Sequence, residues 1–418
     1  MMKDIRCYFK NKSSNELFFE ASLYFYVGTL PLFLNLNTIA LWFLIASSLF
    51  TIKAHKGLSN LKENLVNLLP ICLLYLMFII GLFLSKNKQI VYVDLTRTLP
   101  LCIIPFIVFL NGKKHFNIKK IFIALGIGIG IGILICWQNI FLSIMSKAEP
   151  LKQAGYFFEW IYTDINLVKP LKGHPSYFAI LIVIFISAII FDKNFETFRE
   201  NKLRLLLLLT PYFIFLIETN SRVGIIVLLV LFFVYTIKHM SLKLLLSFFF
   251  LVSVITLFSI KFDYLGSKFQ KVINSKGEVT SERVGRWREI IEVFKEKDSH
   301  IFGVGSGDAR LVYRRAYYNG KYNLAFKKNY NAHNQYLELL VSNGVLGLSV
   351  YLFVFLFFSI QTKLKANALH FFIAFSIFSF SETLFGRSQG VMMFSFFYAL
   401  FIVNNKTLMV TKDGNEQE

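Results

Sequence analysis

Tyr330-Asn331-Ala332-His333-Asn334-Gln335-Tyr336-Leu337-Glu338-Leu339-Leu340-Val341-Ser342-Asn343-Gly344-Val345-Leu346-Gly347 is the stretch that decides the fold. It joins a long polar segment to an apolar run with helical character. His333 and Asn334 fall at the expected start of that helix, and Gly344 and Gly347 lie about three and four turns deeper if the helix is regular. We expect the rest of the chain to build a scaffold that presents other charged residues at the level of His333.

The composition predicts a membrane protein. Of the 418 residues, 55% are hydrophobic and only 17% are charged, against roughly 25% charged residues in soluble domains. Apolar runs of about 18–20 residues recur, which matches a hydrocarbon core about 30 Å thick. Because a helix satisfies its own backbone hydrogen bonds in lipid, we expect an all-α polytopic fold.

About twelve membrane helices are expected, with one large outer loop between the ninth and the tenth. The predicted spans are 17–34, 37–52, 66–84, 98–110, 119–141, 174–191, 203–217, 223–237, 242–260, 334–360, 366–380 and 385–403. The chain then divides into helices 1–9 (1–260), the loop (261–332), helices 10–12 (333–403) and a tail (404–418).

The distribution of Lys and Arg predicts the orientation. The net charge of +20 is better explained by cytoplasmic loops than by nucleic-acid binding, because such loops are enriched in basic residues. With the N-terminus inside, the short inner segments hold 21 Lys and Arg and the short outer segments hold nine. Both termini are therefore expected in the cytoplasm and the large loop outside. The polar start, Met1 to Lys12, lacks a following cleavage site, which indicates an uncleaved first span.

Two further stretches have an expected structural role. The alternating glycines from Gly126 to Gly132 favour close helix packing over phosphate binding, because small residues four apart let membrane helices approach each other. In the outer loop, Glu282 to Lys297 has helical spacing, and a second, basic and aromatic helix is expected around Arg310 to Lys321. The first helix is expected to place Val284, Trp287, Ile290, Ile291 and Phe294 on one apolar face.

Several kinds of cofactor site are absent from the sequence. There is no D-x-D motif, no Walker A sequence and no H-E-x-x-H, and the four cysteines are scattered without metal-ligand spacing. We therefore expect neither a metal nor another cofactor.

Charged groups at the outer ends of the predicted spans are the candidate functional residues. They are Lys172, His174, Arg222, His333 and Arg387. Each has a simpler interpretation: a snorkelling Arg222, a solvated Lys172 and His174, an interfacial pair of Arg387 with Glu382, or a helix-capping His333. Their common level favours one shared site.

Loop arginines strengthen the prediction of an anion site. Arg283 and Arg286 lie in the outer loop, and a guanidinium forms bidentate bonds to phosphate oxygens. The N-terminus of the helix after His333 adds a positive dipole end. Together these features favour binding of a diphosphate.

The signature around His333 resembles that of bacterial O-antigen ligases. His333-Asn334, nine residues, Gly344, two residues and Gly347 fit the pattern H-[NSQ]-x9-G-x-x-[GTY]. Three other segments are similar to the superfamily of O-antigen ligases and polymerases: Thr219-Asn220-Ser221-Arg222, Ser281-Glu282-Arg283-Val284-Gly285-Arg286-Trp287 and Ile301-Phe302-Gly303-Val304-Gly305-Ser306-Gly307. The resemblance is firm over about 219–350 and architectural before that. Lys172-Gly173-His174-Pro175 departs from the Asn-Pro-Asn-like motif common in the superfamily.

The resemblance implies a glycosyltransferase with type C architecture in the bacterial inner membrane. Its donor would be a glycan on undecaprenyl diphosphate and its acceptor a sugar of the lipid A core in lipopolysaccharide biosynthesis, with inversion and without a metal. Carried over by motif, Arg222 and Arg283 would bind the donor diphosphate. His333 would act on the acceptor hydroxyl on the periplasmic side, with Arg286, Asn334, Lys172, His174 and Arg387 as further substrate-binding residues.

Two alternatives stay open at this point. A polymerase of the same superfamily shares the chemistry and differs only in its acceptor. A polysaccharide transporter or flippase is disfavoured, because transporters often show repeated halves and midplane sites, whereas these candidate residues lie at one membrane face.

Overall fold

The computed structural model describes residues 13–112, 116–146, 161–239, 282–365 and 367–413, with four isolated positions between 243 and 253. Every regular element in these residues is helical, as predicted. Five described helices are long and apolar enough to cross a membrane, or six if the bent pair Pro175–Phe191 and Lys193–Arg199 forms one span. The chain is therefore a multi-pass membrane protein, and the number twelve stays a prediction.

Apolar helices lie where most of the spans were predicted. In chain order they are α2 (Ser14–Thr29), α3 (Leu34–Thr51), α4 (Gly57–Leu84), α5 (Lys88–Thr98), α6 (Pro100–Asn111), α7 (Ile118–Ser146), α8 (Pro175–Phe191), α10 (Lys202–Glu218), α11 (Arg222–His239), α17 (Gln335–Thr362), α18 (Asn367–Ser381) and α19 (Ser388–Asp413). Short elements between them are η3 (Lys169–Leu171), η4 (Lys193–Phe195), α9 (Glu196–Arg199) and η5 (Leu384–Gly386). The short span predicted at 98–110 is the second half of a longer apolar stretch, Lys88–Asn111. The span predicted at 242–260 lies outside the described residues, apart from isolated positions.

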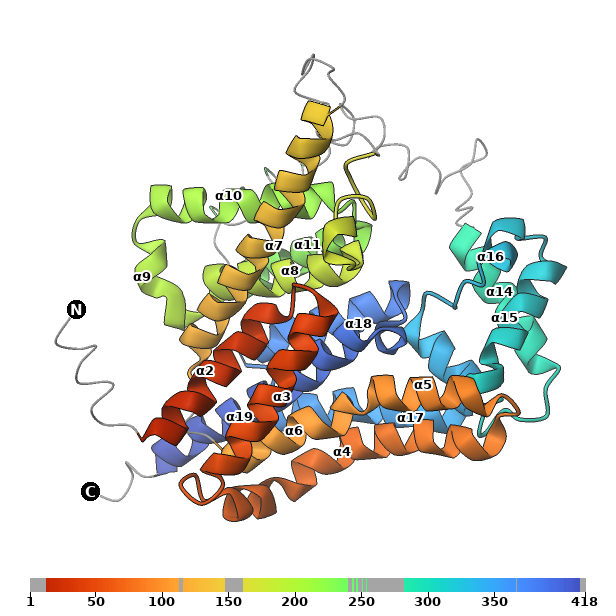
Figure 1. The fold of residues 1–418 in the computed structure, drawn as a ribbon, viewed down its shortest axis with the longest axis horizontal. Helices are drawn as coiled ribbons and strands as arrows, with labels where there is room; N and C mark the ends of the chain where they lie inside the picture. Colours follow the sequence, from red (N-terminus) through yellow and green to blue (C-terminus); the bar gives the residue numbers. More distant parts are fainter. Residues whose placement is uncertain are drawn as a thin grey trace.

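The centre of the bundle is formed by α8 and α19. Nearly all of α8 is buried, and so are residues 391–403 of α19. α19 contacts α6 and α17, α4 contacts α6 and α17, and α8 contacts α11 and α18. α2 packs on α3 and α7 at the side of the bundle (Figure 1). The N-termini of α8, α11 and α17 lie at one end of the bundle, while α7 and α18 start at the other.

The glycines of α7 serve close packing, as predicted. A Cβ on Gly128 would lie 1.8 Å from the Gly28 carbonyl oxygen of α2, and one on Gly126 would lie 2.4 Å from the Phe185 ring of α8. Neither contact leaves room for a side chain, so the α7 backbone lies directly against its neighbours.

α17 is not the regular helix expected after His333. Gly344 has φ 68° and ψ −167°, which breaks it into a short segment from Gln335 and a longer one that ends at Thr362. Such a conformation is essentially restricted to glycine. Gly347 has a separate role: a Cβ there would lie 2.2 Å from the Cβ of Asn343, whose amide donates to the Met77 carbonyl oxygen of α4 (2.7 Å).

The residues 300–305 replace the hydrogen bonds that the break removes from α17. The amides of Val304 and Gly305 donate to the carbonyls of Val341 and Ser342 at 3.0 and 2.9 Å. On the other side of the break, the amides of Val345 and Leu346 donate to the carbonyls of His300 and Ile301 at 2.9 and 3.1 Å. Buried backbone groups need such partners, so the glycine turn and the α17 break form one unit.

The described part of the predicted outer loop folds into three helices on the bundle end. They are α14 (Glu282–Lys295), α15 (Ser306–Asn319) and α16 (Asn323–Lys327), which share a small core with the start of α17 (Figure 1). The apolar face of α14 was predicted only in part: Ile290 and Phe294 are buried as expected, but Val284 and Ile291 are 43% and 38% exposed. Val293 is buried in their place because α14 packs on α15 through that side.

Substitution of Gly344 by alanine tests the coupled break. A Cβ there would lie 2.2 Å from the Ile301 carbonyl oxygen, and the backbone conformation alone costs a non-glycine residue about 1–3 kcal/mol. We expect a clear loss of thermal stability for the detergent-purified variant. Gly130→Ala is the control, because that helical Cβ would have its nearest neighbour at 3.4 Å and alanine favours helices. Equal midpoints for the two variants would contradict the coupling.

Candidate functional site

A polar cavity of about 570 Å³ lies at the end of the bundle that carries α14 to α16. Most of the predicted site residues line it: His174, Arg222, Arg283, Arg286, His333 and Arg387. They come from five separate segments of the chain, since Arg283 and Arg286 both lie on α14. The structure thus brings charged residues that are far apart in sequence to one cavity, and their roles stay a prediction.

Two predicted site residues do not line the cavity. Lys172 has a left-handed backbone (φ 52°) after the short helix η3. Asn334 caps α17: its side-chain oxygen accepts from the Leu337 amide at 3.0 Å, and the residue is 6% exposed. The helix-capping role that was considered for His333 therefore belongs to Asn334.

His333 lies just before the cap in a strained backbone conformation. Its φ is 46°, and its amide donates to the side-chain oxygen of Asn331 at 3.1 Å. The ring meets the edge of Tyr330 with centroids 5.5 Å apart. A non-glycine residue with positive φ persists only where neighbouring contacts hold it, so the imidazole is presented by its surroundings rather than by α17 itself.

The peptide carbonyls of Asn331 and Ala332, next to His333, accept hydrogen bonds from α14 and α15. Trp287 of α14 donates its indole N–H to the Ala332 carbonyl at 2.8 Å, and the hydroxyl of Tyr317 in α15 donates to the Asn331 carbonyl at 2.9 Å. The Ala332 amide donates to the carboxylate of Glu338 at 3.4 Å. The position of His333 therefore depends on α14, α15 and α17 together.

Glu382 has a different partner in the structure from the one considered in the sequence analysis. It was considered as a partner for Arg387, but its Oε2 lies 3.6 Å from Nδ1 of His333, and its Oε1 accepts from the Ser176 hydroxyl at 2.8 Å. Burial raises the pKa of Glu382, but the contact with His333 and the proximity of His174 outweigh it, so the pKa is below its ordinary value. The carboxylate form next to His333 is therefore favoured.

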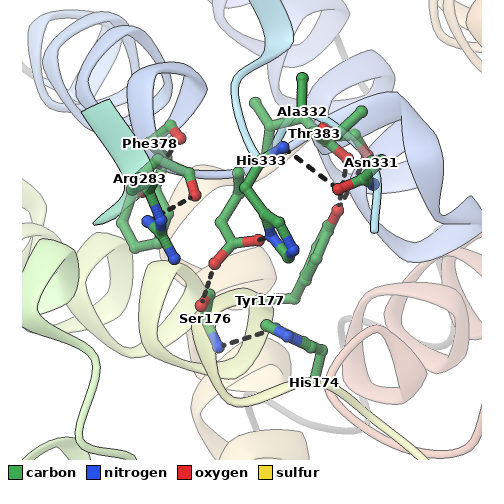
Figure 2. Close-up of polar contacts among 12 residues, drawn as sticks. His174, Ser176, Tyr177, Arg283, Asn331, Ala332, His333, Phe378 and Thr383 are labelled. Atoms are coloured by element: carbon green, nitrogen blue, oxygen red, sulfur yellow. Dashed lines mark hydrogen bonds and ion pairs between the residues drawn. The ribbon is translucent and has the colours of Figure 1, made fainter. Parts of the chain in front are cut away.

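Figure 2 shows how these groups face each other. Arg283 and His333 approach from one side, and Ser176 and His174 from α8 lie opposite. The Tyr177 hydroxyl donates to the Thr383 carbonyl at 2.8 Å and fixes α8 against the turn that carries Glu382. Because Ser176, Glu382 and Thr383 are joined in this way, α8 and the end of α18 form one wall of the cavity.

The cationic wall of the cavity is formed by Arg222, Arg283 and Arg286. Arg283 donates to the Ser381 carbonyl at 3.0 Å; burial lowers its pKa, Glu382 raises it, and the nearby charges of Arg222 and Arg286 lower it further. An arginine keeps its charge despite such a shift. The guanidinium of Arg286 lies 5.6 Å from the Tyr330 ring centre, and its Nε is buried without a hydrogen-bond partner in the described structure. Like charges held this close favour an anionic ligand.

Comparison with known families supports this interpretation. Residues 205–352 match the family model described as O-antigen ligase. Residues 205–352 therefore carry a domain of the O-antigen ligase superfamily. A search of the curated proteins finds no match.

The matched region contains only part of the cavity. Arg222, Arg283, Arg286 and His333 lie within residues 205–352, whereas His174 and Glu382 lie outside. No group of three or more His, Cys, Asp or Glu side chains that could hold a metal occurs among the residues that the structure describes.

The electrostatics of His174 predict acid sensitivity. It caps α8, where its Nδ1 accepts from the Ser176 amide at 3.4 Å, and burial lowers its pKa, although the Glu382 charge opposes this. Because the pKa is lower in the folded state than in the unfolded state, the neutral form stabilises the fold. This contribution is complete above the ordinary value of about 6.5 and is lost as the pH falls through the lowered value.

We therefore expect His174→Asn to flatten the pH dependence of thermal stability between pH 7.5 and 5. Asparagine is a good N-cap that does not titrate, and the depressed pKa of Glu382 places its own effect at lower pH. The exposed His300 gives a matched control, because His300→Asn should keep the wild-type slope. A wild-type slope in His174→Asn would mean that another group causes the acid sensitivity.

Proposed function

We propose that this protein is a membrane glycosyltransferase of the O-antigen ligase type. It transfers a glycan from undecaprenyl diphosphate to a sugar hydroxyl of the lipid A core. The observation that carries the proposal is the cavity, in which Arg222, Arg283 and Arg286 face the pair of His333 and Glu382. The family match to residues 205–352 supports the same chemistry.

The donor diphosphate binds the cationic wall. Three guanidinium groups at one cavity provide forked donors that match phosphate oxygens. The N-termini of α8 and α11 lie at this cavity, with His174, Ser176 and Arg222 among its lining residues, and they add positive dipole ends. As the glycosyl bond breaks, negative charge develops on the departing diphosphate, and these groups stabilise it.

His333 and Glu382 act on the acceptor. The acceptor oxygen attacks the anomeric carbon as the carbon–oxygen bond to the diphosphate breaks, and the hydroxyl proton passes to the imidazole of His333. Glu382 orients the ring through Nδ1 (3.6 Å) and stabilises the imidazolium that forms, in the manner of other carboxylate–histidine pairs. A single displacement inverts the anomeric centre. The diphosphate is already a good leaving group, so the reaction needs neither a metal nor a nucleotide.

This reaction takes place on the periplasmic side of the inner membrane. The distribution of Lys and Arg supports a topology with both termini in the cytoplasm and the described helices α14 to α16 on the periplasmic face. The donor reaches the cavity from the lipid phase, because undecaprenyl chains stay in the bilayer.

Reconstituted vesicles with purified substrates test the function. With a lipid-linked glycan donor and a lipid A-core acceptor, we expect a lipid A-linked product, formed also in the presence of a chelator. Elongation of a second lipid-linked glycan in place of the core would identify a polymerase. No transfer to either acceptor would contradict the proposal, and a loss of activity with the chelator would contradict its metal-free mechanism.

Arg283→Lys tests the donor site. A lysine ammonium is a compact point charge and lacks the planar fork by which arginine binds two phosphate oxygens. We therefore expect transfer to fall about 10- to 100-fold, the range for a charged hydrogen bond of about 1.5–3 kcal/mol. Arg288→Lys is the matched control, because Arg288 is exposed on the same helix. Near-normal transfer by Arg283→Lys at normal expression would make Arg283 structural.

A further inference from the structure

A second cavity lies at the end of the bundle opposite the candidate site. Its volume is about 340 Å³, and it is lined by the start of α7, the end of α8, the α17–α18 connection and α19. α8 and α18 border the candidate site only with their opposite ends, and α7 and α19 do not line it. The cavity therefore lies at the other boundary of the membrane.

Asn367 lines the cavity with an unused acceptor. Its amide nitrogen donates to Asp192, which fixes the orientation of the group, because an amide oxygen would repel the carboxylate. The residue is 5% exposed, yet its side-chain oxygen is buried without a hydrogen-bond partner in the described structure. An orphaned buried acceptor costs free energy, and a ligand with a hydrogen-bond donor would satisfy it.

The side-chain amides of Asn404 and Asn405, like that of Asn367, donate hydrogen bonds from their nitrogen. The amide nitrogen of Asn405 donates to the Gln361 carbonyl at 2.6 Å, and that of Asn404 donates to the Leu400 carbonyl at 2.9 Å. One N–H of each amide is used by helix backbone, which fixes its orientation and leaves its oxygen as an acceptor for the cavity that both residues line. The wall is thus suited to hydroxyl groups.

The charges of the cavity favour an anion. Lys119 and Lys365 line it against one carboxylate, Asp192. Asp192 already accepts from the backbone and side-chain amides of Asn194 at 2.7 and 2.8 Å, in addition to Asn367. Two lysines against one satisfied carboxylate leave an excess positive charge, which suits a phosphate group.

We propose that this cavity binds the headgroup of an anionic phospholipid, a phosphate ester that carries free hydroxyl groups. The phosphate pairs with Lys119 and Lys365, and the hydroxyls donate to Asn367 and the neighbouring amide oxygens. Its place at the ends of membrane helices favours a lipid over a soluble ester. The site is independent of the transferase reaction proposed for the other end.

Short-chain lipids of defined headgroup test the site on the purified full-length protein by native mass spectrometry. Dioctanoyl phosphatidylglycerol should bind about tenfold or more tightly than dioctanoyl phosphatidylcholine, whose headgroup has no hydrogen-bond donor. Equal binding of the two lipids would overturn the proposal. Displacement of the lipid by glycerol 3-phosphate at comparable concentration would overturn the lipid assignment and identify a soluble ester.

A charge-matched pair of variants locates the binding. Lys119→Ala with Lys365→Ala should weaken phosphatidylglycerol binding about tenfold or more, because each lysine near a phosphate contributes on the order of 1 kcal/mol. Lys53→Ala with Lys202→Ala removes two exposed lysines that do not line the cavity and should change binding less than about twofold. An equal effect of the two pairs would place the lipid elsewhere. Equal binding of the two headgroups by the wild-type protein would overturn the proposal without any variant, even if the substituted proteins fold poorly.

Discussion

The structure of the candidate site depends on the break of α17 at Gly344. A helix that continued straight from Gln335 would leave the turn at residues 300–305 without partners. Instead, four backbone hydrogen bonds join that turn to residues 341–346 on both sides of the break. The turn leads directly into α15, and α15 together with α14 holds the peptide groups next to His333. The glycine break thus links the membrane bundle to the segment that presents the imidazole.

A second constraint is the separation of charge within the cavity. Three of the four arginines that line the cavity come from α11 and α14, whereas Glu382 lies at the end of α18 with His333 beside it. Arg283 donates a hydrogen bond to the carbonyl of Ser381, the residue before Glu382, and so links α14 to the end of α18. This arrangement keeps a carboxylate close to the imidazole, although its charge also acts on Arg283. Four arginines and only two carboxylates, Asp164 and Glu382, line the cavity, which favours an anionic substrate. In the proposed reaction, the same separation puts the leaving diphosphate and the acceptor hydroxyl at different walls.

The sequence predicted the helical membrane fold and most of the cavity, but not its internal pairing. Arg222, Arg283, Arg286 and His333 could be found because each lies in a recognisable local pattern. The pairing of His333 with Glu382 could not be predicted in this way. The position of Glu382 depends on how α8 packs on α18, and its contact with Ser176 spans 206 residues of the sequence. Gly344 could be recognised as the glycine of the signature. Its positive φ could not be predicted, because it depends on hydrogen bonds with the distant turn at residues 300–305. Lys172 was included only for its charge and its place before a span, and it does not line the cavity.

The role of His333 is tested most directly by His333→Asn in reconstituted vesicles with purified donor and acceptor. Asparagine can still form a hydrogen bond but cannot accept a proton, so a single-turnover measurement separates chemistry from binding. A positioned general base contributes about 10²–10⁴-fold, and we expect the transfer rate to fall by that factor while the donor still binds the arginine wall. Recovery of a substantial part of the wild-type rate in His333→Asn would show that the imidazole only orients the substrate, which would contradict its proposed role as the base.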